Sequence, residues 1–253
     1  MSLYLFANAL TVIALALSAS TSSLAQRAQQ KPAKPSGFAP GLSADEVNEA
    51  ERRLAELGHW TRLRDGTFTD DSRRHALIAF QKVTRRQRTG RLTTEELQAL
   101  RSANRPLPLE SGHTHVEIDL TRQVLFIVVR DAGLTKILPV STGNGKLFTE
   151  GGRTRRAITP TGRFTVYRKI NGWRKSALGL LYYPLYIVGG VAIHGNPSVP
   201  AWPASHGCIR IPMFAAKEFS EMMPIGTVVM VYGGGPTGKE DVIADGRPTV
   251  LCR

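Results

Sequence analysis

The chain has 253 residues, of which 42% are hydrophobic, so it is long enough for one full-size domain with its own core and a small companion. Lys and Arg number 33 against 20 Asp and Glu, and the formal net charge of +13 favours an anionic partner: nucleic acid, a membrane surface or an acidic polymer such as cell wall. Aromatic residues make up only 7% and no nucleic-acid motif is present, so we expect no nucleic-acid partner.

The N-terminus has the features of an export signal. Residues 3–19 are almost wholly apolar, and the small-x-small pattern Ser23-Leu24-Ala25 follows them. This predicts a secretory signal peptide over residues 1–25 and hence an exported protein, located in a periplasm or cell wall. No Lys or Arg precedes the apolar run, so a retained membrane anchor is the alternative, and we expect membrane contact only through this segment. A polar linker over residues 26–41 comes next.

Residues 42–105 read as a small helical domain of three short helices. A capping box, Ser43-Ala44-Asp45-Glu46, opens the first helix, and Gly58 ends it. The second helix begins near Asp70, and another capping box, Thr93-Thr94-Glu95-Glu96, opens the third.

This helical part resembles the peptidoglycan-binding three-helix domain. Four stretches carry the resemblance: Arg53 to Trp60, Asp65 to Asp70, Ala79-Phe80-Gln81 and Thr89 to Thr93. A generic helical spacer is the alternative interpretation of this part.

Residues 106–232 read as a mostly-β domain with one or two helices. His113 and His115 stand at the start of the first expected strand, and we interpret both as exposed polar residues. The clearest helix candidate is Pro212 to Met223, with Pro212 near its first turn. A Gly/Pro-rich tail covers residues 233–253. The expected strands are Val116 to Leu120, Val124 to Val129, Ile137 to Val140, Phe164 to Val166, Leu185 to Val188, Val191 to Ile193 and Val228 to Val231.

The stretch from His194 to Cys208 places two histidines and a cysteine on one Gly/Pro-rich excursion. A cysteine is a good nucleophile only as the thiolate, and an adjacent imidazole is the usual way to form one near neutral pH. The stretch therefore predicts a cysteine enzyme that attacks a carbonyl. Zinc binding by His194, His206 and Cys208 is the alternative, but no second close ligand pair supports it, so we expect no metal and no cofactor.

The chain has two cysteines, Cys208 and Cys252. In an exported protein two cysteines suggest a disulfide first. Pairing them would abolish the proposed nucleophile. We therefore interpret Cys208 as functional and Cys252 as incidental or redox-sensitive.

Five ordered motifs between about residues 115 and 232 resemble the L,D-transpeptidases of the YkuD type. They are Pro139 to Gly143, Thr159 to Phe164, Tyr183 to Ile187, Ile193-His194-Gly195 and Pro203 to Arg210. The resemblance implies a YkuD-like β-sandwich catalytic domain over residues 106–232.

The resemblance also implies catalytic roles. Cys208 matches the nucleophile, and His194 matches the histidine that takes and returns its proton. The carbonyl of Gly195 would fix the tautomer of that imidazole in place of a carboxylate. His206 matches a second histidine that orients the loop. The main-chain N–H groups of His206, Gly207 and Cys208 would form the oxyanion hole, with Gly207 leaving room for the acyl group.

For substrate binding, Arg210 matches a position that can meet a carboxylate. We add Ser205, Trp202 and Tyr183 as substrate-binding candidates, although Trp202 could equally anchor its loop. The segment from Lys146 to Lys175 holds nine Lys or Arg and one acid. We interpret it as a cationic active-site flap that attracts carboxylates, and a solvated basic loop is the alternative.

Together these features predict an exported peptidoglycan L,D-transpeptidase that forms crosslinks through a Cys208 thioester on a stem-peptide donor. The implied partners are peptidoglycan stem peptides and glycan, and carbapenem-type inhibitors. The alternatives are an L,D-carboxypeptidase that hydrolyses stem peptides and a non-catalytic wall-binding protein.

Overall fold

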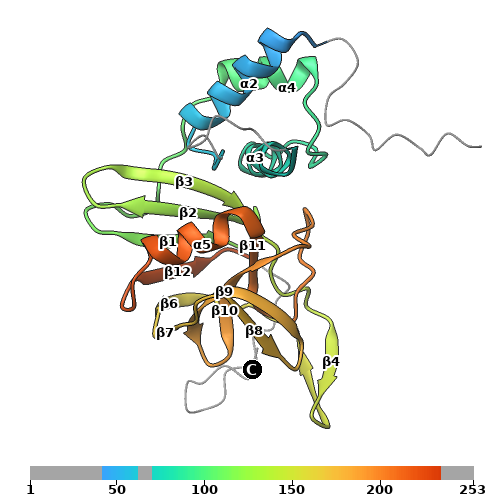
Figure 1. Cartoon of the computed structure of the whole chain (residues 1–253), viewed down its shortest axis with the longest axis vertical. Coiled ribbons are helices and arrows are strands. Elements are labelled where there is room, and N and C mark those ends of the chain that lie inside the picture. The colour runs from blue at the N-terminus through green and yellow to red at the C-terminus, as the bar shows by residue number, and fades with distance from the viewer. Residues whose placement is uncertain (1–41, 62–69, 235–253) are drawn as a thin grey trace, which may run out of the picture. The chain divides into compact units, whose positions relative to one another are not determined.

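A computed structural model of the chain describes residues 42–61 and 70–234 (Figure 1). The predicted signal peptide, the linker, most of the tail, most of the stretch from Asp65 to Asp70 and Cys252 lie outside the described residues. All described residues fall within one compact unit, residues 37–253. Among the helices that the structure describes, none has the length and apolar character needed to cross a bilayer.

The N-terminal part forms the expected helices α2 (Ala44–Glu56), α3 (Asp70–Val83) and α4 (Thr94–Ser102). The predicted capping box of α2 is confirmed, because the Ser43 hydroxyl and the Glu46 carboxylate each accept a hydrogen bond from the other's backbone N–H. Gly58 follows α2 with φ of 90°, a conformation that favours glycine. These helices share a core of their own, which includes Leu54, Leu77, Phe80, Leu97 and Leu100.

Two five-stranded sheets follow. The first has the order β3-β2-β1-β12-β6, with β1 and β12 parallel and the other pairs antiparallel. Its strands are β1 (His115–Asp119), β2 (Val124–Val129), β3 (Gly133–Pro139), β6 (Gly162–Thr165) and β12 (Val228–Tyr232).

The second sheet has the order β11-β10-β9-β7, and β8 also pairs with β9. Its strands are β7 (Arg168–Lys169), β8 (Trp173–Ser176), β9 (Gly179–Val188), β10 (Val191–Asn196) and β11 (Ile209–Pro212). A separate hairpin joins β4 (Leu147–Glu150) to β5 (Arg153–Arg156).

Both sheets and helix α5 (Met213–Met222) contribute to one hydrophobic core. Ile118 and Val229 come from the first sheet, Ile193 and Ile209 from the second, and Phe219 from α5. This packing confirms the predicted fold class, a mainly β domain with one helix in the expected place, preceded by a small helical part.

Strand β1 corrects one prediction. His115 was expected to be exposed, yet its side chain is fully buried, and its Nε2 lies 3.0 Å from Oε1 of Glu117. The Glu117 carboxylate also accepts hydrogen bonds from the N–H groups of Leu109 and Glu110. The connection that precedes the strand therefore covers this face of β1, a long-range contact that alternation along the strand cannot reveal.

Helix α3 packs on the first sheet. Ala79 forms a small buried cluster with Val124, Phe126, Leu134 and Ile137. The domain boundary between residues 105 and 106 stays a prediction, but the two parts share this apolar contact.

Candidate active site

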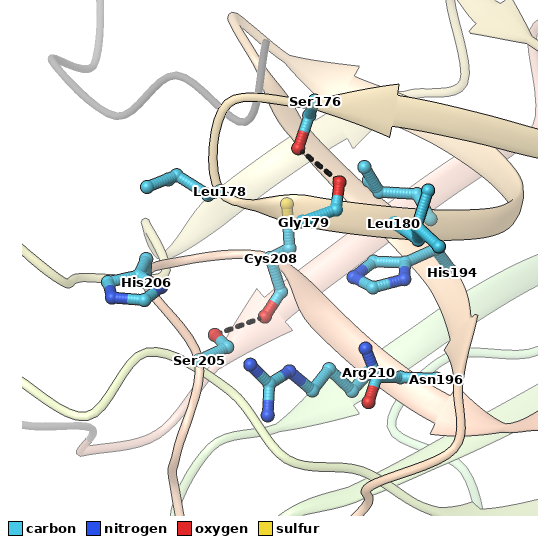
Figure 2. Close-up of a pocket in the computed structure, with 11 residues that line it drawn as sticks. Ser176, Leu178, Gly179, Leu180, His194, Asn196, Ser205, His206, Cys208 and Arg210 are labelled. Carbon is cyan, nitrogen blue, oxygen red and sulfur yellow. Dashed lines mark hydrogen bonds between the residues drawn. The ribbon is translucent and has the colours of Figure 1, made fainter. Parts of the chain in front are cut away.

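Strands β10 and β11 run side by side in parallel, and their register pairs His194 with Arg210. Cys208 directly precedes β11, so the sheet brings the predicted nucleophile and base to the same edge. Both line one pocket of about 70 Å³ (Figure 2). The complete lining is Ser176, Leu178, Gly179, Leu180, Leu181, His194, Asn196, Ser205, His206, Cys208 and Arg210.

The imidazole of His194 is held in one orientation. Its Nδ1 lies 2.9 Å from the carbonyl oxygen of Gly195. A carbonyl only accepts hydrogen bonds, so Nδ1 carries the proton and Nε2 of the neutral ring is an acceptor. Burial lowers the pKa of His194 to about 4, with a smaller lowering by Arg210 and an opposing effect of the Gly195 carbonyl. The ring is therefore neutral near pH 7 and able to accept a proton.

Gly195 has a steric reason to be glycine. A Cβ built at this position would lie 2.6 Å from Cβ of Ala216 and 3.1 Å from Cδ1 of Tyr182. Helix α5, which carries Ala216, therefore packs directly against the backbone that fixes the imidazole. The sequence motif identified Gly195 only as the residue whose carbonyl would orient His194. The close approach of Ala216 is a second reason why this position is glycine.

Cys208 is 3% exposed, and its Sγ accepts a hydrogen bond from the N–H of Ala192 at 3.4 Å. Its sulfur is disulfide-bonded in this structure. The expectation of a free Cys208 thiol is therefore not met in this structure. A disulfide sulfur cannot be the nucleophile, so the predicted chemistry requires reduction.

The Ser205 hydroxyl makes two hydrogen bonds within the loop. Its Oγ donates to the Cys208 carbonyl at 2.6 Å and accepts from the Gly207 N–H at 3.0 Å (Figure 2 shows the first of these bonds). Ser205 also lines the pocket, and its substrate-binding role stays a prediction. The Gly207 N–H, one of the three predicted oxyanion-hole donors, is likewise used inside the loop.

Gly207 adopts φ of 135°, a conformation that residues with a side chain rarely adopt. Backbone conformation therefore accounts for this glycine, in addition to the predicted room for an acyl group.

Thr159 braces the same loop and was not singled out from the sequence. Its hydroxyl donates to the Gly207 carbonyl at 2.7 Å and accepts from the Gly143 N–H at 2.9 Å. A Cβ at Gly143 would lie 2.4 Å from the Ala157 carbonyl oxygen, so the chain can approach this closely only with glycine there. Both residues lie in motifs that the resemblance quoted, but the motifs alone give neither residue a role.

Arg210 lines the pocket and is half-buried. Burial lowers the pKa of its guanidinium. Among the ion pairs of the described residues, none involves Arg210, so its guanidinium faces the pocket without a protein carboxylate. Within residues 42–61 and 70–234, no group of three or more His, Cys, Asp or Glu side chains is arranged to hold a metal ion.

The other predicted residues lie at the margin. The His206 ring lines the pocket and makes an edge contact with Phe148 of β4, with 4.8 Å between ring centroids. Trp202 and Tyr183 do not line this pocket. Trp202 is 64% exposed, and its carbonyl accepts from the Ser141 hydroxyl. Tyr183 adopts φ of 47° and packs edge-on against Tyr182.

The predicted basic flap is divided into several elements. Residues 147–156 form the β4–β5 hairpin, which touches the site loop through Phe148, whereas the later strands β6, β7 and β8 belong to the two large sheets. The single cationic flap over residues 146–175 is therefore wrong as a structural unit. Only the hairpin stands apart from the main sheets, because the residues after it are taken up in sheet pairing.

The chain is similar in sequence and in fold to known proteins. The sequence model described as L,D-transpeptidase catalytic domain, YkuD, matches residues 113–231. No curated protein matches the chain. Among solved structures, an L,D-transpeptidase from Xylanimonas cellulosilytica is 39% identical, with a TM-score of 0.68, and the alignment covers 74% of this chain and 93% of that one.

A second solved structure, an L,D-transpeptidase from Stackebrandtia nassauensis, is 23% identical, with 74% of this chain and 91% of that chain covered and a TM-score of 0.44. The first similarity extends over nearly the whole of a solved relative, and the family match includes both His194 and Cys208. This chain therefore belongs to the YkuD family of L,D-transpeptidases.

Proposed function

We propose that this chain is an exported peptidoglycan L,D-transpeptidase that acts through a thioester on Cys208. The observation that carries the proposal is that His194 and Cys208 line one pocket, while the Gly195 carbonyl sets the imidazole tautomer. Membership of the family supplies the reaction class. The export signal of the sequence supports a location outside the cytoplasm.

The first half of the reaction forms the thioester. After reduction of Cys208, Nε2 of His194 takes the thiol proton and the sulfur attacks the carbonyl carbon between an L-centre and a D-residue of a stem peptide. The main-chain N–H groups of His206 and Cys208 donate hydrogen bonds to the resulting oxyanion and stabilise its negative charge. The oxyanion then collapses, the carbon–nitrogen bond breaks, and the leaving amine takes the proton from His194.

The second half resolves the thioester. An amine from a second stem peptide attacks the acyl carbon, gives its proton to His194 and restores the thiol, which leaves a new amide crosslink. Water in place of the amine gives a carboxypeptidase. The choice depends on how well the acceptor groove binds an amine and excludes water.

Arg210 provides a carboxylate-binding position in this scheme. Its half-buried guanidinium faces the pocket, and a stem-peptide carboxylate would supply the counter-charge that the described protein residues do not. The cations of the β4–β5 hairpin, such as Arg153 and Arg156, would raise the local concentration of anionic donors. Binding of glycan by the N-terminal helices is part of the same proposal.

The test is mass spectrometry of muropeptides after incubation of the reduced, purified protein with a tetrapeptide donor, with and without an amine acceptor. We expect crosslinked product from the wild type and none from Cys208→Ala, which should still bind purified sacculi. Trimmed stems without crosslinks would favour the hydrolase, and binding without any turnover would favour the non-catalytic protein. Reduced wild type should also gain one carbapenem adduct in an intact-mass measurement.

A further inference from the structure

A lysine from the helical part is buried against the catalytic domain. Lys82, near the end of α3, is 1% exposed. Its Nζ donates to the carbonyl oxygens of Gln123 at 3.0 Å and Val140 at 2.8 Å. Burial lowers the pKa of Lys82 well below its ordinary value, and either protonation state can supply the two donors. A buried lysine is costly unless its hydrogen bonds are made, so these contacts fix the position of both carbonyls.

Gln123 connects Lys82 to the segment that contains Thr142. This residue is 1% exposed and adopts φ of 62°, which is uncommon for a residue with a side chain. Its side chain donates to the Thr142 hydroxyl at 2.7 Å and accepts from the Thr142 N–H at 3.0 Å. The side chain of Gln123 thus binds both the backbone and the side chain of Thr142.

Thr142 in turn holds the loop of the predicted nucleophile. Its carbonyl accepts hydrogen bonds from the N–H groups of Ala204 at 3.0 Å and Ser205 at 2.9 Å. The Ser205 hydroxyl then donates to the Cys208 carbonyl at 2.6 Å. A continuous series of hydrogen bonds therefore runs from Lys82 through Gln123, Thr142 and Ser205 to Cys208.

We propose that Lys82 and Gln123 are positioning residues for the reaction of Cys208, so that the helical part of the chain has a second role in fixing the catalytic loop. The inference rests on the proposed function for the identity of the reaction. Its content is separate: a residue in α3, remote in sequence from the nucleophile, sets how well the Cys208 sulfur and the oxyanion donors are placed. Catalysis is sensitive to such placement, because small displacements of reacting groups cost large factors in rate.

The test uses the full chain, reduced, with two single variants. Lys82→Met keeps most of the aliphatic stem and removes the donor, and Thr142→Val keeps the side-chain shape and removes the hydroxyl that Gln123 contacts. For each protein we would measure the saturating rate of acylation by a carbapenem and the rate of Cys208 alkylation by iodoacetamide as a function of pH. We expect each variant to slow acylation by about tenfold or more, with little change in the concentration that gives half the maximal rate.

The matched control is Arg53→Met. Arg53 also donates from a helix to backbone carbonyls, those of Leu100 and Ala103, but within the helical part and away from the catalytic loop. Its loss should lower thermal stability without slowing acylation. If Lys82→Met behaves like this control, its role is only structural and the proposal is overturned.

The double variant Lys82→Met/Thr142→Val sharpens the test. Two residues in one series of contacts should not have additive effects, so we expect the double variant to lose little more rate than either single one. A rate loss in the double variant equal to the product of the two single losses would show that Lys82 and Thr142 act independently, and would contradict the proposal. If Lys82→Met does not fold, Thr142→Val alone decides, and an unchanged rate in that variant overturns the proposal.

The two proposals fail in different ways. If reduced wild type is not acylated, the proposed function is lost, while the pH dependence of Cys208 alkylation in the variants still reports whether the series positions the sulfur. If wild type is acylated and the variants react at the same rate and with the same pH dependence, only the positioning role is lost.

Discussion

The Nδ1 atom of His194 lies 2.9 Å from the carbonyl oxygen of Gly195, the next residue in the same strand. An orienting acceptor is thus built into the backbone of β10, where many other enzymes use a separate carboxylate. The arrangement adds no negative charge beside the ring, so burial dominates and the imidazole is neutral. This relationship leads to predictions about the ring, the backbone that holds it and the sulfur it would serve.

The first prediction concerns the charge of His194. In the oxidised protein we expect its ring resonances, followed by NMR, to titrate near pH 4 rather than near the ordinary 6.5. Reduction of Cys208 should move this pKa upward, because a thiolate stabilises a neighbouring imidazolium. A titration that is the same in both redox states would show that the ring does not sense the sulfur, contrary to the proposed proton transfer.

The second prediction concerns Gly195→Ala. The added methyl group would press on Ala216 of α5, so either the helix or the strand must shift. We expect a loss of about 1–3 kcal/mol in the free energy of unfolding, measured with denaturant, and a larger proportional loss of acylation rate. Gly234→Ala is the control, since a Cβ there meets nothing within 4 Å. Equal stabilities of the two variants would contradict the close approach of α5.

The third prediction concerns the redox state of Cys208. Because the sulfur is disulfide-bonded, untreated wild type should not be acylated, and treatment with a phosphine reductant followed by desalting should restore the reaction. The sequence has only one other cysteine, so Cys252→Ser cannot form an intrachain disulfide and should react without reductant. Full acylation of untreated, disulfide-intact wild type, checked by intact mass, would refute this prediction.

The fourth prediction concerns acid stability. His59 is buried, and its Nδ1 has no hydrogen-bond partner among the described residues. Burial lowers the pKa of His59 from 6.5 to about 3, with a smaller lowering by Arg105. Between pH 6.5 and 3, His59 is therefore protonated in the unfolded chain and neutral in the folded chain. The free energy of unfolding falls as the pH drops through this range.

His59→Phe removes this proton-binding difference and keeps an aromatic ring against Phe80. Its free energy of unfolding should vary less with pH in that window than that of wild type, by up to about 1.4 kcal/mol per pH unit. Chemical denaturation at several pH values measures this. Parallel pH curves for the two proteins would rule out His59 as a source of acid sensitivity.

Much of the fold could be predicted from local patterns. The capping box at Ser43, the apolar runs of β2 and β10 and the position of α5 all depend on residues close in the chain. The site pair could be predicted as well, since His194 and Cys208 lie in motifs whose order the family resemblance supplies. Parallel pairing of β10 with β11 then brings them together.

The failures share one cause, which is contact between distant segments. His115 is buried because residues 109 and 110 fold over it and donate hydrogen bonds to Glu117. The bracing of Gly207 by Thr159 likewise depends on a partner that no local pattern identifies. A sequence motif names the reacting groups and does not reveal what holds them.

The apolar contact between α3 and the first sheet affects how the protein can be divided. Val124, Phe126 and Ile137 are almost inaccessible to solvent in the structure, in part because Ala79 lies against them. A recombinant fragment that begins at residue 106 would leave this patch bare on a two-stranded section of β-sheet, where exposed apolar strands invite association with other copies. Production of the catalytic part alone would therefore favour aggregates, and solubilising substitutions on that patch would be the remedy.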